Sequence, residues 1–485
     1  MLNIKEHFKL TAVYTFFAAF PALLQLIVYP LIEGKGLLGA TDFGYLAITE
    51  SIISVASVFC LFGTSSGIAR LYYDYNDDRS DYNRLVSSVL TGILGRGLLL
   101  LGFSIIFGSF IGDLFSHQEL QDFGDYGPLL MISGLNRAII VMSITLFRHE
   151  KRILAFIIVS LASGIMRSAF QVIGVLFFEL SFLGYVQGTA IGGGATALGV
   201  ASYLYFSCGF SYNKTINRGL YSFSRPLFFS DLVFWGLLYI DRFFLIDKPD
   251  DLGVYDVALK FAIGIQLIIQ GLSSAIGPEL FRNLKEGVSK RAQEIMMISN
   301  LFVAEAIGII MICIIPAMLF ISVFYETELT LSAGLIAITF VRYIFRVQYQ
   351  VFSLPVMFSK RTNIIFYINV GVLILNTLLY WVLIPLYSYY GAIMAYFFSN
   401  FLQVIIFRFV QGKIIPIKWN SNKVFYFPLG IILTASLLEF LKVYLGINAY
   451  LTSTLLIIIT FIGYYVIYRK EVEGIWLGIK NRIFS

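Results

Sequence analysis

The sequence predicts an all-α polytopic membrane protein with about fourteen transmembrane helices. Its composition, its regularly spaced apolar segments and an alternating charge pattern indicate this fold class. Of 485 residues, 58% are hydrophobic and 13% are charged, against about 25% charged in an average soluble domain. The mean hydropathy is +0.82. Because so few charges cannot cover the surface of a soluble protein of this size, we exclude a cytosolic enzyme, a nucleic-acid binder and a disordered chain.

Apolar windows recur along the whole chain, and each is close to the length of about 20 residues that spans a bilayer as a helix. The first window follows Lys5 and Lys9. It is too long for a signal-peptide core and lacks a small-residue cleavage site, so we interpret it as the first span. The fourteen windows are 10–32, 43–66, 86–111, 125–147, 153–178, 182–209, 226–246, 253–277, 298–323, 331–358, 363–385, 389–411, 424–444 and 448–468.

The basic residues between the windows predict the orientation. If the N-terminus is cytoplasmic, 25 Lys and Arg residues fall in inner segments, and only Lys35, Lys248 and Lys442 fall in outer loops. Cytoplasmic loops carry such an excess of positive charge. Because an extra or a missing helix would reverse the alternation downstream, the pattern supports both the number of spans and a cytoplasmic location of both termini.

Two landmarks recur at one offset and predict an internal duplication. Asp42-Phe43-Gly44 and Asp251-Leu252-Gly253 are 209 residues apart, and so are Lys151-Arg152 and Lys360-Arg361. Duplicated halves with a site at their interface are typical of transporters. We therefore expect two pseudo-symmetric six-helix lobes around a central cavity. The expected divisions are an N-terminal lobe at 1–215, a C-terminal lobe at 216–420, and two appended helices with a cytoplasmic tail at 421–485.

Several ionisable side chains lie inside the windows, where each costs about 2.5–3.5 kcal/mol at a helix centre. Asp256 and Lys260 are four residues apart and can pair on one helix face. Asp241 and Arg242 lie near a span end and can extend toward the interface. Five arginines lie about mid-span, and with Lys260 they form the predicted cationic cavity: Arg96, Arg137, Arg167, Arg342 and Arg346.

These arginines have two interpretations. They either pair with intramembrane acids and join helices, or they line a water-filled cavity between the lobes. The mid-span acids are too few to neutralise them all, which favours the cavity. The planar guanidinium group suits phosphate because it presents a fork of hydrogen-bond donors.

The sequence lacks a Gly-x-x-x-x-Gly-Lys-Ser/Thr loop for ATP and any cluster of metal ligands. We therefore expect no cofactor, no metal and no nucleotide, and transport driven by an ion gradient or by consumption of the product. The candidate proton or sodium sites are Glu50, Asp231, Asp256 and Glu305, although these acids can instead neutralise neighbouring arginines. Gly184, Gly188 and Gly192 recur every four residues and predict a close helix-packing face.

The chain resembles the polysaccharide-exporter branch of the multidrug/oligosaccharidyl-lipid/polysaccharide flippase superfamily, which includes the Wzx-type O-antigen flippases. The order and spacing of short motifs over the first twelve spans carry the resemblance. The motifs are Phe43-Gly44-Tyr45, Phe62-Gly63, Ala69-Arg70-Leu71-Tyr72, Asp241-Arg242-Phe243-Phe244-Leu245, Leu252-Gly253-Val254-Tyr255, Gly277-Pro278, Asn376, Leu383-Ile384-Pro385-Leu386-Tyr387 and Gly391-Ala392.

The resemblance implies alternating access in the bacterial inner membrane, with a polyprenyl-diphosphate-linked oligosaccharide as cargo. The cargo would be an O-antigen, capsule or exopolysaccharide repeat unit. Expected partners are membrane lipids and, beyond the cargo, a glycan polymerase and chain-length proteins, but no nucleic acid.

Two alternatives share this plan. A lipid II flippase would also have fourteen spans and a cationic cavity. A drug/cation antiporter would have an acidic cavity and usually twelve spans. A membrane-embedded polymerase or ligase would be expected to carry catalytic residues on a long outer loop, which this sequence lacks, so we expect no enzyme.

The charge pattern generates a topology prediction. A reporter that is active only in the periplasm should be inactive when it is fused after Ser485, because the C-terminus is expected in the cytoplasm. The same reporter fused after Lys248, in a predicted outer loop, should be active. Activity of the Ser485 fusion would refute the predicted number of spans.

Overall fold

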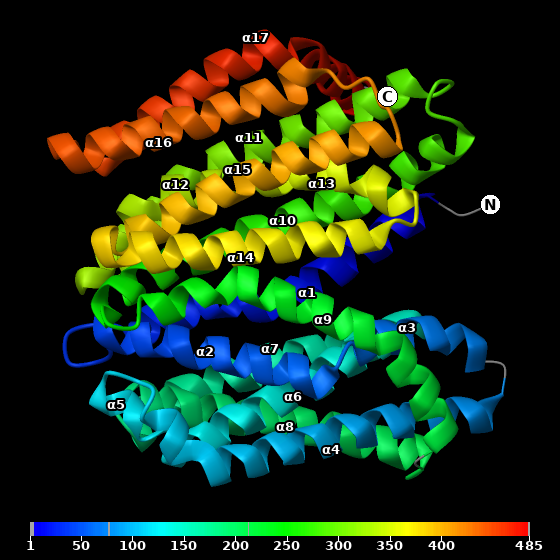
Figure 1. Cartoon of the computed structure of the whole chain (residues 1–485), viewed down its shortest axis with the longest axis vertical. Coiled ribbons are helices and arrows are strands. Elements are labelled where there is room, and N and C mark those ends of the chain that lie inside the picture. Colours follow the sequence, from blue (N-terminus) through cyan, green and yellow to red (C-terminus); the bar gives the residue numbers. More distant parts are fainter. Residues whose placement is uncertain (1–3, 76–77, 212, 484–485) are drawn as a thin grey trace. The chain divides into compact units, whose positions relative to one another are not determined.

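The computed structural model describes residues 4–75, 78–211 and 213–483, and nearly all of them are helical (Figure 1). Within these ranges the β-structure is a single isolated bridge between Glu33 and Leu38. The chain divides into two compact units, residues 1–253 and 254–485. This boundary differs from the predicted lobe boundary after residue 215, and that lobe division stays a prediction.

The first unit is built from helices whose apolar faces form one core. Buried side chains of α2, α3, α4, α6, α7, α8 and α9 make up this core, with Val89, Phe147 and Phe156 among them. The helices are α1 (Ile4–Ile32), α2 (Ala40–Leu61), α3 (Thr64–Tyr75), α4 (Arg79–Gly112), α5 (Gln118–Gln121), α6 (Phe123–His149), α7 (Ile153–Ile173), the π-helical turn η1 (Gly174–Phe178), α8 (Phe182–Cys208) and α9 (Lys214–Phe244).

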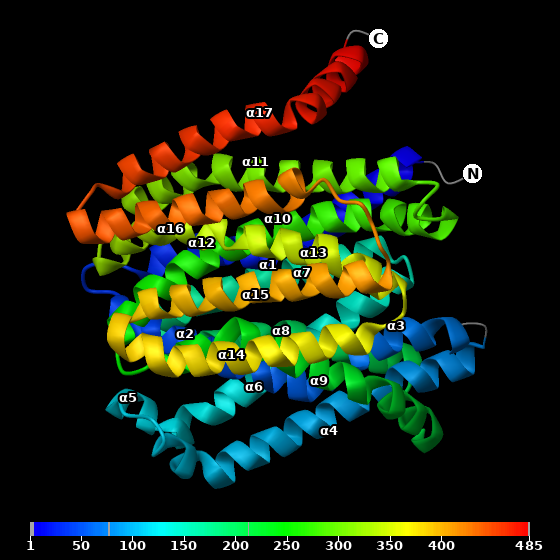
Figure 2. The same ribbon diagram turned by 45° about the horizontal axis from the view of Figure 1, so that its top comes forward.

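The second unit begins within α10. Its last helix bends at Tyr468, whose backbone leaves the helical region (φ −106°, ψ 18°), and the bend is visible at the red end of the chain (Figure 2). The helices are α10 (Pro249–Glu286), α11 (Ala292–Phe324), the 3-10 turn η2 (Glu328–Leu335), α12 (Ile336–Val341), α13 (Tyr343–Phe358), α14 (Thr362–Tyr387), α15 (Tyr389–Ile414), the π-helical turn η3 (Asn422–Tyr426), α16 (Phe427–Leu445) and α17 (Ala449–Ile483).

The helices confirm the predicted fold class. Among the described residues, eleven helical segments are long and apolar enough to cross a membrane. The long helices α1, α8 and α9 correspond to the three remaining predicted windows. Helix α9 is less apolar because charged residues such as Arg225 and Asp231 interrupt it. Large apolar side chains such as Leu99 (75%) and Phe206 (91%) are exposed, as suits a lipid-facing surface.

The predicted duplication is present in the helix boundaries. Helices α2 and α10 begin at Ala40 and Pro249, and α7 and α14 begin at Ile153 and Thr362, so each pair of starts is 209 residues apart. Lys151 and Lys360, the equivalent residues before α7 and α14, both have a positive φ, 56° and 60°. Two lysines that share an unusual left-handed conformation at equivalent positions indicate that the same local structure occurs twice.

The start of α2 and the start of α10, which are equivalent in the repeat, also contact each other. A Cβ atom added to Gly44 would lie 2.1 Å from the carbonyl oxygen of Pro249, and one added to Gly253 would lie 2.1 Å from that of Ala40. Residues 40 and 249, and residues 44 and 253, are equivalent in the repeat. Both glycines are required because the two backbones meet without room for a side chain.

The glycines of α8 form the predicted packing face against α7. Added Cβ atoms at Gly188 and Gly192 would lie 2.0 and 2.4 Å from the carbonyl oxygens of Phe170 and Met166. Gly184 would meet the carbonyl oxygens of Glu179 and Gly174 in the same way. Without a hydrophobic force between helices in lipid, this close approach provides the van der Waals contact that holds α7 and α8 together.

We expect Gly188→Ala to lower the unfolding temperature of the purified protein in detergent. The added methyl group overlaps a backbone carbonyl that cannot move freely, and overpacking of this kind costs about 1–3 kcal/mol. Gly199→Ala on the same helix is the matched control, because an added Cβ there has no neighbour within 4 Å. The control should keep or slightly raise the unfolding temperature, and equal temperatures for the two variants would contradict the packing role.

Candidate functional site

A carboxylate and two guanidinium groups meet inside the first unit. The Glu50 carboxylate on α2 pairs with Arg137 of α6, at 2.8 Å between Oε1 and Nη1, and with Arg167 of α7, at 2.7 Å between Oε2 and Nη2. We call these three residues the Glu50 cluster. The Glu50 side chain is 12% exposed, whereas those of Arg137 and Arg167 are 33% and 22% exposed.

The Glu50 cluster combines the two interpretations that the sequence left open. Glu50 neutralises one arginine charge and joins three helices, as expected for a structural ion pair. Because two arginines share one carboxylate, the three side chains still carry one net positive charge. Both arginine side chains are more exposed than the side chain of Glu50.

A neutral polar network lies beside Arg167 and was not expected from the sequence. Gln25 of α1 donates to the Gln171 side chain at 2.9 Å and accepts a hydrogen bond from Tyr185 at 2.7 Å. Gln171, one turn after Arg167 on α7, donates to Thr189 of α8 at 2.9 Å. The signal for this network in the sequence is the presence of the glutamines Gln25 and Gln171 inside apolar windows.

Arg96 contacts the carbonyl end of helix α2. Its Nε donates to the carbonyl oxygen of Cys60 at 2.7 Å, and its Nη1 donates to the Tyr221 hydroxyl at 2.6 Å. Cys60 lies in the last turn of α2, where Phe62 (φ 49°) and Gly63 (φ 68°) separate α2 from α3. Arg96 therefore donates to free carbonyl groups at the C-terminal end of α2. Its positive charge is stabilised there because the C-terminal end of a helix carries a partial negative charge.

The cationic candidates of the second unit lie against aromatic rings and one acid. Arg342, 7% exposed, lies over the Tyr396 ring at 3.9 Å from its centroid, and Arg346 lies over the Tyr349 ring at 5.0 Å. Lys260 is 3.8 Å from Asp256, as expected for residues four apart on a helix. Asp256 is thus an ion-pair partner in addition to being a candidate ion site.

The remaining acids have contrasting environments. Asp231 on α9 is exposed and Glu305 on α11 is half-buried, and neither forms an ion pair with the side chains that the structure describes. Asp241 and Arg242 pair at 3.3 Å and are 5% and 3% exposed. This pair is buried within the protein instead of extending toward the membrane interface as expected.

The structure brings together Glu50, Arg137 and Arg167. Arg96 contacts the end of α2 instead of this cluster, and Arg342, Arg346 and Lys260 lie in the other unit. That all six cations line one cavity between two lobes stays a prediction. Within the residues that the structure describes, no group of three His, Cys, Asp or Glu side chains could hold a metal ion.

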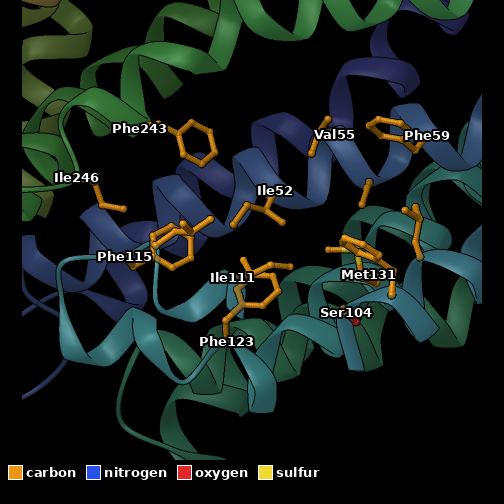
Figure 3. Close-up of a pocket in the computed structure, with 14 residues that line it drawn as sticks. Ile52, Val55, Phe59, Ser104, Ile111, Phe115, Phe123, Met131, Phe243 and Ile246 are labelled. Carbon is orange, nitrogen blue, oxygen red and sulfur yellow. The ribbon is translucent and has the colours of Figure 1, made fainter. Parts of the chain in front are cut away.

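The first unit also contains an apolar cavity of about 500 Å³ between α2, α4, α6 and α9 (Figure 3). Ile52, Val55 and Phe59 line it from α2, and Phe243 and Ile246 line it from the end of α9 and the segment that follows. The charged candidates do not line it. A charged group would lose its hydration there without replacement, so this cavity suits hydrocarbon and not a phosphate.

The sequence model of the polysaccharide biosynthesis protein family matches residues 36–331. No curated protein matches this chain. The chain is similar in structure to the lipid II flippase MurJ in an inward closed conformation, with a TM-score of 0.70, 16% identity, and coverage of 96% of this chain and 99% of that one.

Two further structures share the architecture. A multidrug resistance MATE family transporter of the MOP superfamily, in an inward-facing conformation, has a TM-score of 0.61 at 13% identity and covers 83% of this chain and 98% of its own. A MOP superfamily transporter from Pyrococcus furiosus has a TM-score of 0.57 at 13% identity, with 84% and 96% covered. At these identities the likeness shows that the chain has the MurJ/MATE-like fold.

We predict that Glu50→Gln lowers stability because it leaves two arginines facing each other without a carboxylate. Breaking a buried pair costs about 3–5 kcal/mol, and partial exposure of both arginines reduces the expected loss to about 2 kcal/mol. Denaturation of the purified protein in detergent measures the effect.

Asp231→Asn is the matched control for this substitution, since Asp231 is a span acid without an ion pair and should tolerate it. The double variant Glu50→Gln with Arg137→Gln should recover part of the loss, because only one uncompensated arginine remains. A Glu50→Gln variant as stable as Asp231→Asn would contradict the pairing.

Proposed function

Because this chain belongs to the polysaccharide biosynthesis protein family, whose model matches more than half of its sequence, we propose that it is a flippase for a polyprenyl-diphosphate-linked oligosaccharide. It would move the cargo across the bacterial inner membrane by alternating access, with both termini in the cytoplasm. The Glu50 cluster is the observation that carries this proposal. It places a net positive charge, carried by two partly exposed arginine side chains, among membrane-spanning helices.

The physical argument concerns the diphosphate. Its negative charges lose their hydration when the head group leaves water, and an uncompensated buried charge costs several kcal/mol. Fixed guanidinium groups replace lost hydration with charge-assisted hydrogen bonds. A cluster of net charge +1 attracts the diphosphate without trapping it, because Glu50 competes for the same donors.

The arginines of the second unit support a contribution to the same cargo. Arg342 and Arg346 lie over tyrosine rings, so their donors are held in place while one face of each guanidinium is covered. Aromatic rings beside fixed donors suit the mixed apolar and polar faces of sugars. We propose that these residues, with Lys260, contact the head group or the glycan during transport.

A lipid II flippase is the second candidate. It is favoured by the likeness to MurJ, which extends over 96% of this chain, whereas the MATE structure covers 83%. A lipid II cargo has the same kind of diphosphate head and differs in its sugars. A drug/cation antiporter fits less well, because the buried carboxylate Glu50 is bound by two arginines and is not available to a cationic drug.

Energy coupling would depend on acids that can exchange a proton or sodium ion. Asp231 and Glu305 are the better candidates of the four, because Glu50 and Asp256 are held in ion pairs. The product would be passed to a glycan polymerase and chain-length proteins in the same membrane. The transport cycle itself makes and breaks no covalent bond, so the proposal requires no catalytic residue.

We expect Arg342→Ala to reduce glycan export per membrane-inserted molecule by tenfold or more, and Arg342→Lys to restore part of it, because a lysine keeps the charge but loses the fork of donors. Surface glycan divided by the amount of inserted protein is the measurement. Arg361→Ala, at an exposed position at the start of α14, is the control and should export normally. Normal export per molecule by Arg342→Ala would exclude this arginine from cargo binding.

The coupling proposal predicts that Asp231→Asn or Glu305→Gln slows gradient-driven flipping in vesicles, while flipping without a gradient stays equal to that of the unsubstituted protein. A reconstituted protein with a fluorescent lipid-linked cargo allows both rates to be measured. If neither substitution changes the response to a proton or sodium gradient, these acids do not couple transport.

A further inference from the structure

A cationic pocket lies at the ends of several helices of the first unit, away from the Glu50 cluster. It has a volume of about 490 Å³ and is lined by the end of α3, the start of α4, the residues between α6 and α7, and the end of α8. Its polar lining contains Tyr72, Arg79, Glu150, Arg152 and Tyr203. The charge pattern assigns this end to the cytoplasm.

The two arginines of this pocket are held by aromatic rings and not by a full set of acids. Arg152 lies 5.5 Å from the Phe147 and Tyr203 ring centroids, donates to the Tyr203 hydroxyl, and pairs with Glu150 at 3.4 Å. Arg79 lies 5.6 Å from the Tyr82 ring and forms no ion pair with the described side chains. Burial raises the pKa of the Glu150 carboxyl group, although the nearby Arg152 and Arg79 guanidinium groups oppose the rise.

An apolar groove continues from the pocket into the membrane region. It has a volume of about 850 Å³ and is formed mainly by α7 and α8. Arg152 and Tyr203 line both the groove and the cationic pocket. Along α7 the lining extends from Ile153 to Met166, which is roughly 20 Å of helix at 1.5 Å per residue. This length is close to one leaflet of a hydrocarbon core about 30 Å thick.

We propose that the pocket and the groove together bind one anionic glycerophospholipid of the surrounding membrane. The phosphate lies between Arg79 and Arg152, and one acyl chain fills the groove between α7 and α8. The net charge of Arg79, Arg152 and Glu150 is +1, which matches a head group with one negative charge. A diphosphate carries about twice that charge, and a polyprenyl chain is longer than the groove, so the cargo fits this site less well.

The equivalent arginine of the other half provides a matched control. Arg361 occupies the position equivalent to Arg152, 209 residues later, before α14. It is exposed and forms no ion pair or ring contact with the described residues. Two glycines form a second matched pair. Gly199 lines the groove, whereas Gly371 is an exposed position on α14, and an added Cβ at either position has no neighbour within 4 Å.

Native mass spectrometry of the full-length protein in detergent tests the proposal by titration with phosphatidylglycerol. Phosphatidylcholine with the same chains, inorganic phosphate and undecaprenyl diphosphate serve as comparison ligands. We expect phosphatidylglycerol to bind most tightly. Arg79→Ala and Arg152→Ala should each weaken it about tenfold, or about 1.4 kcal/mol. Gly199→Phe should block it by filling the groove, whereas Arg361→Ala and Gly371→Phe should bind normally.

Several results would overturn the proposal. Equal binding of phosphatidylcholine would remove the head-group role, and tighter binding of undecaprenyl diphosphate would assign the site to the cargo. Binding of inorganic phosphate as tight as that of the lipid would remove the role of the groove. Circular dichroism and gel filtration identify a variant that fails to fold, and an equal loss in Arg361→Ala and Arg152→Ala would show that the arginine acts outside this site.

Discussion

The absence of water from the bilayer core is the constraint on which the rest of this structure depends. Each backbone amide and carbonyl there needs an internal partner, so the chain forms long helices through its apolar segments. The same constraint acts on charges, and it explains why Glu50 binds Arg137 and Arg167 at hydrogen-bond distance. Pairing is incomplete, and the positive charge that remains among the helices is the feature that suits a phosphate-bearing cargo.

The helices contain an internal duplication. Equivalent helices begin 209 residues apart, and Gly44 and Gly253 approach the carbonyls of Pro249 and Ala40 in a reciprocal manner. The two copies have since diverged in their polar residues. The first carries the Glu50 cluster and the proposed lipid pocket at Arg152, whereas the second carries arginines against tyrosines, so the polar contacts of the two copies differ.

The arginines inside the predicted spans make three kinds of contact, which differ with the groups that surround them. Arg96 caps the carbonyl end of α2 beside a break in the helix, Arg167 pairs with a buried acid, and Arg342 lies over an aromatic ring. Each arrangement lowers the cost of a guanidinium group in the membrane in a different way. An arginine inside a span is therefore a signal of either structure or function, and its contacts distinguish the two.

The sequence by itself determined the fold class, the fourteen helical segments, the repeat and the glycine face of α8, because apolar length, charge alternation and residue spacing are local properties. It also identified the charged residues that require partners. Only the tertiary structure decided which partners they have. Glu50 and Arg167 are 117 residues apart, Gln25 meets Tyr185 across 160 residues, and Arg96 reaches a helix end that the sequence did not mark. Such contacts depend on how helices pack and rotate against each other, and no pattern within one helix contains that information.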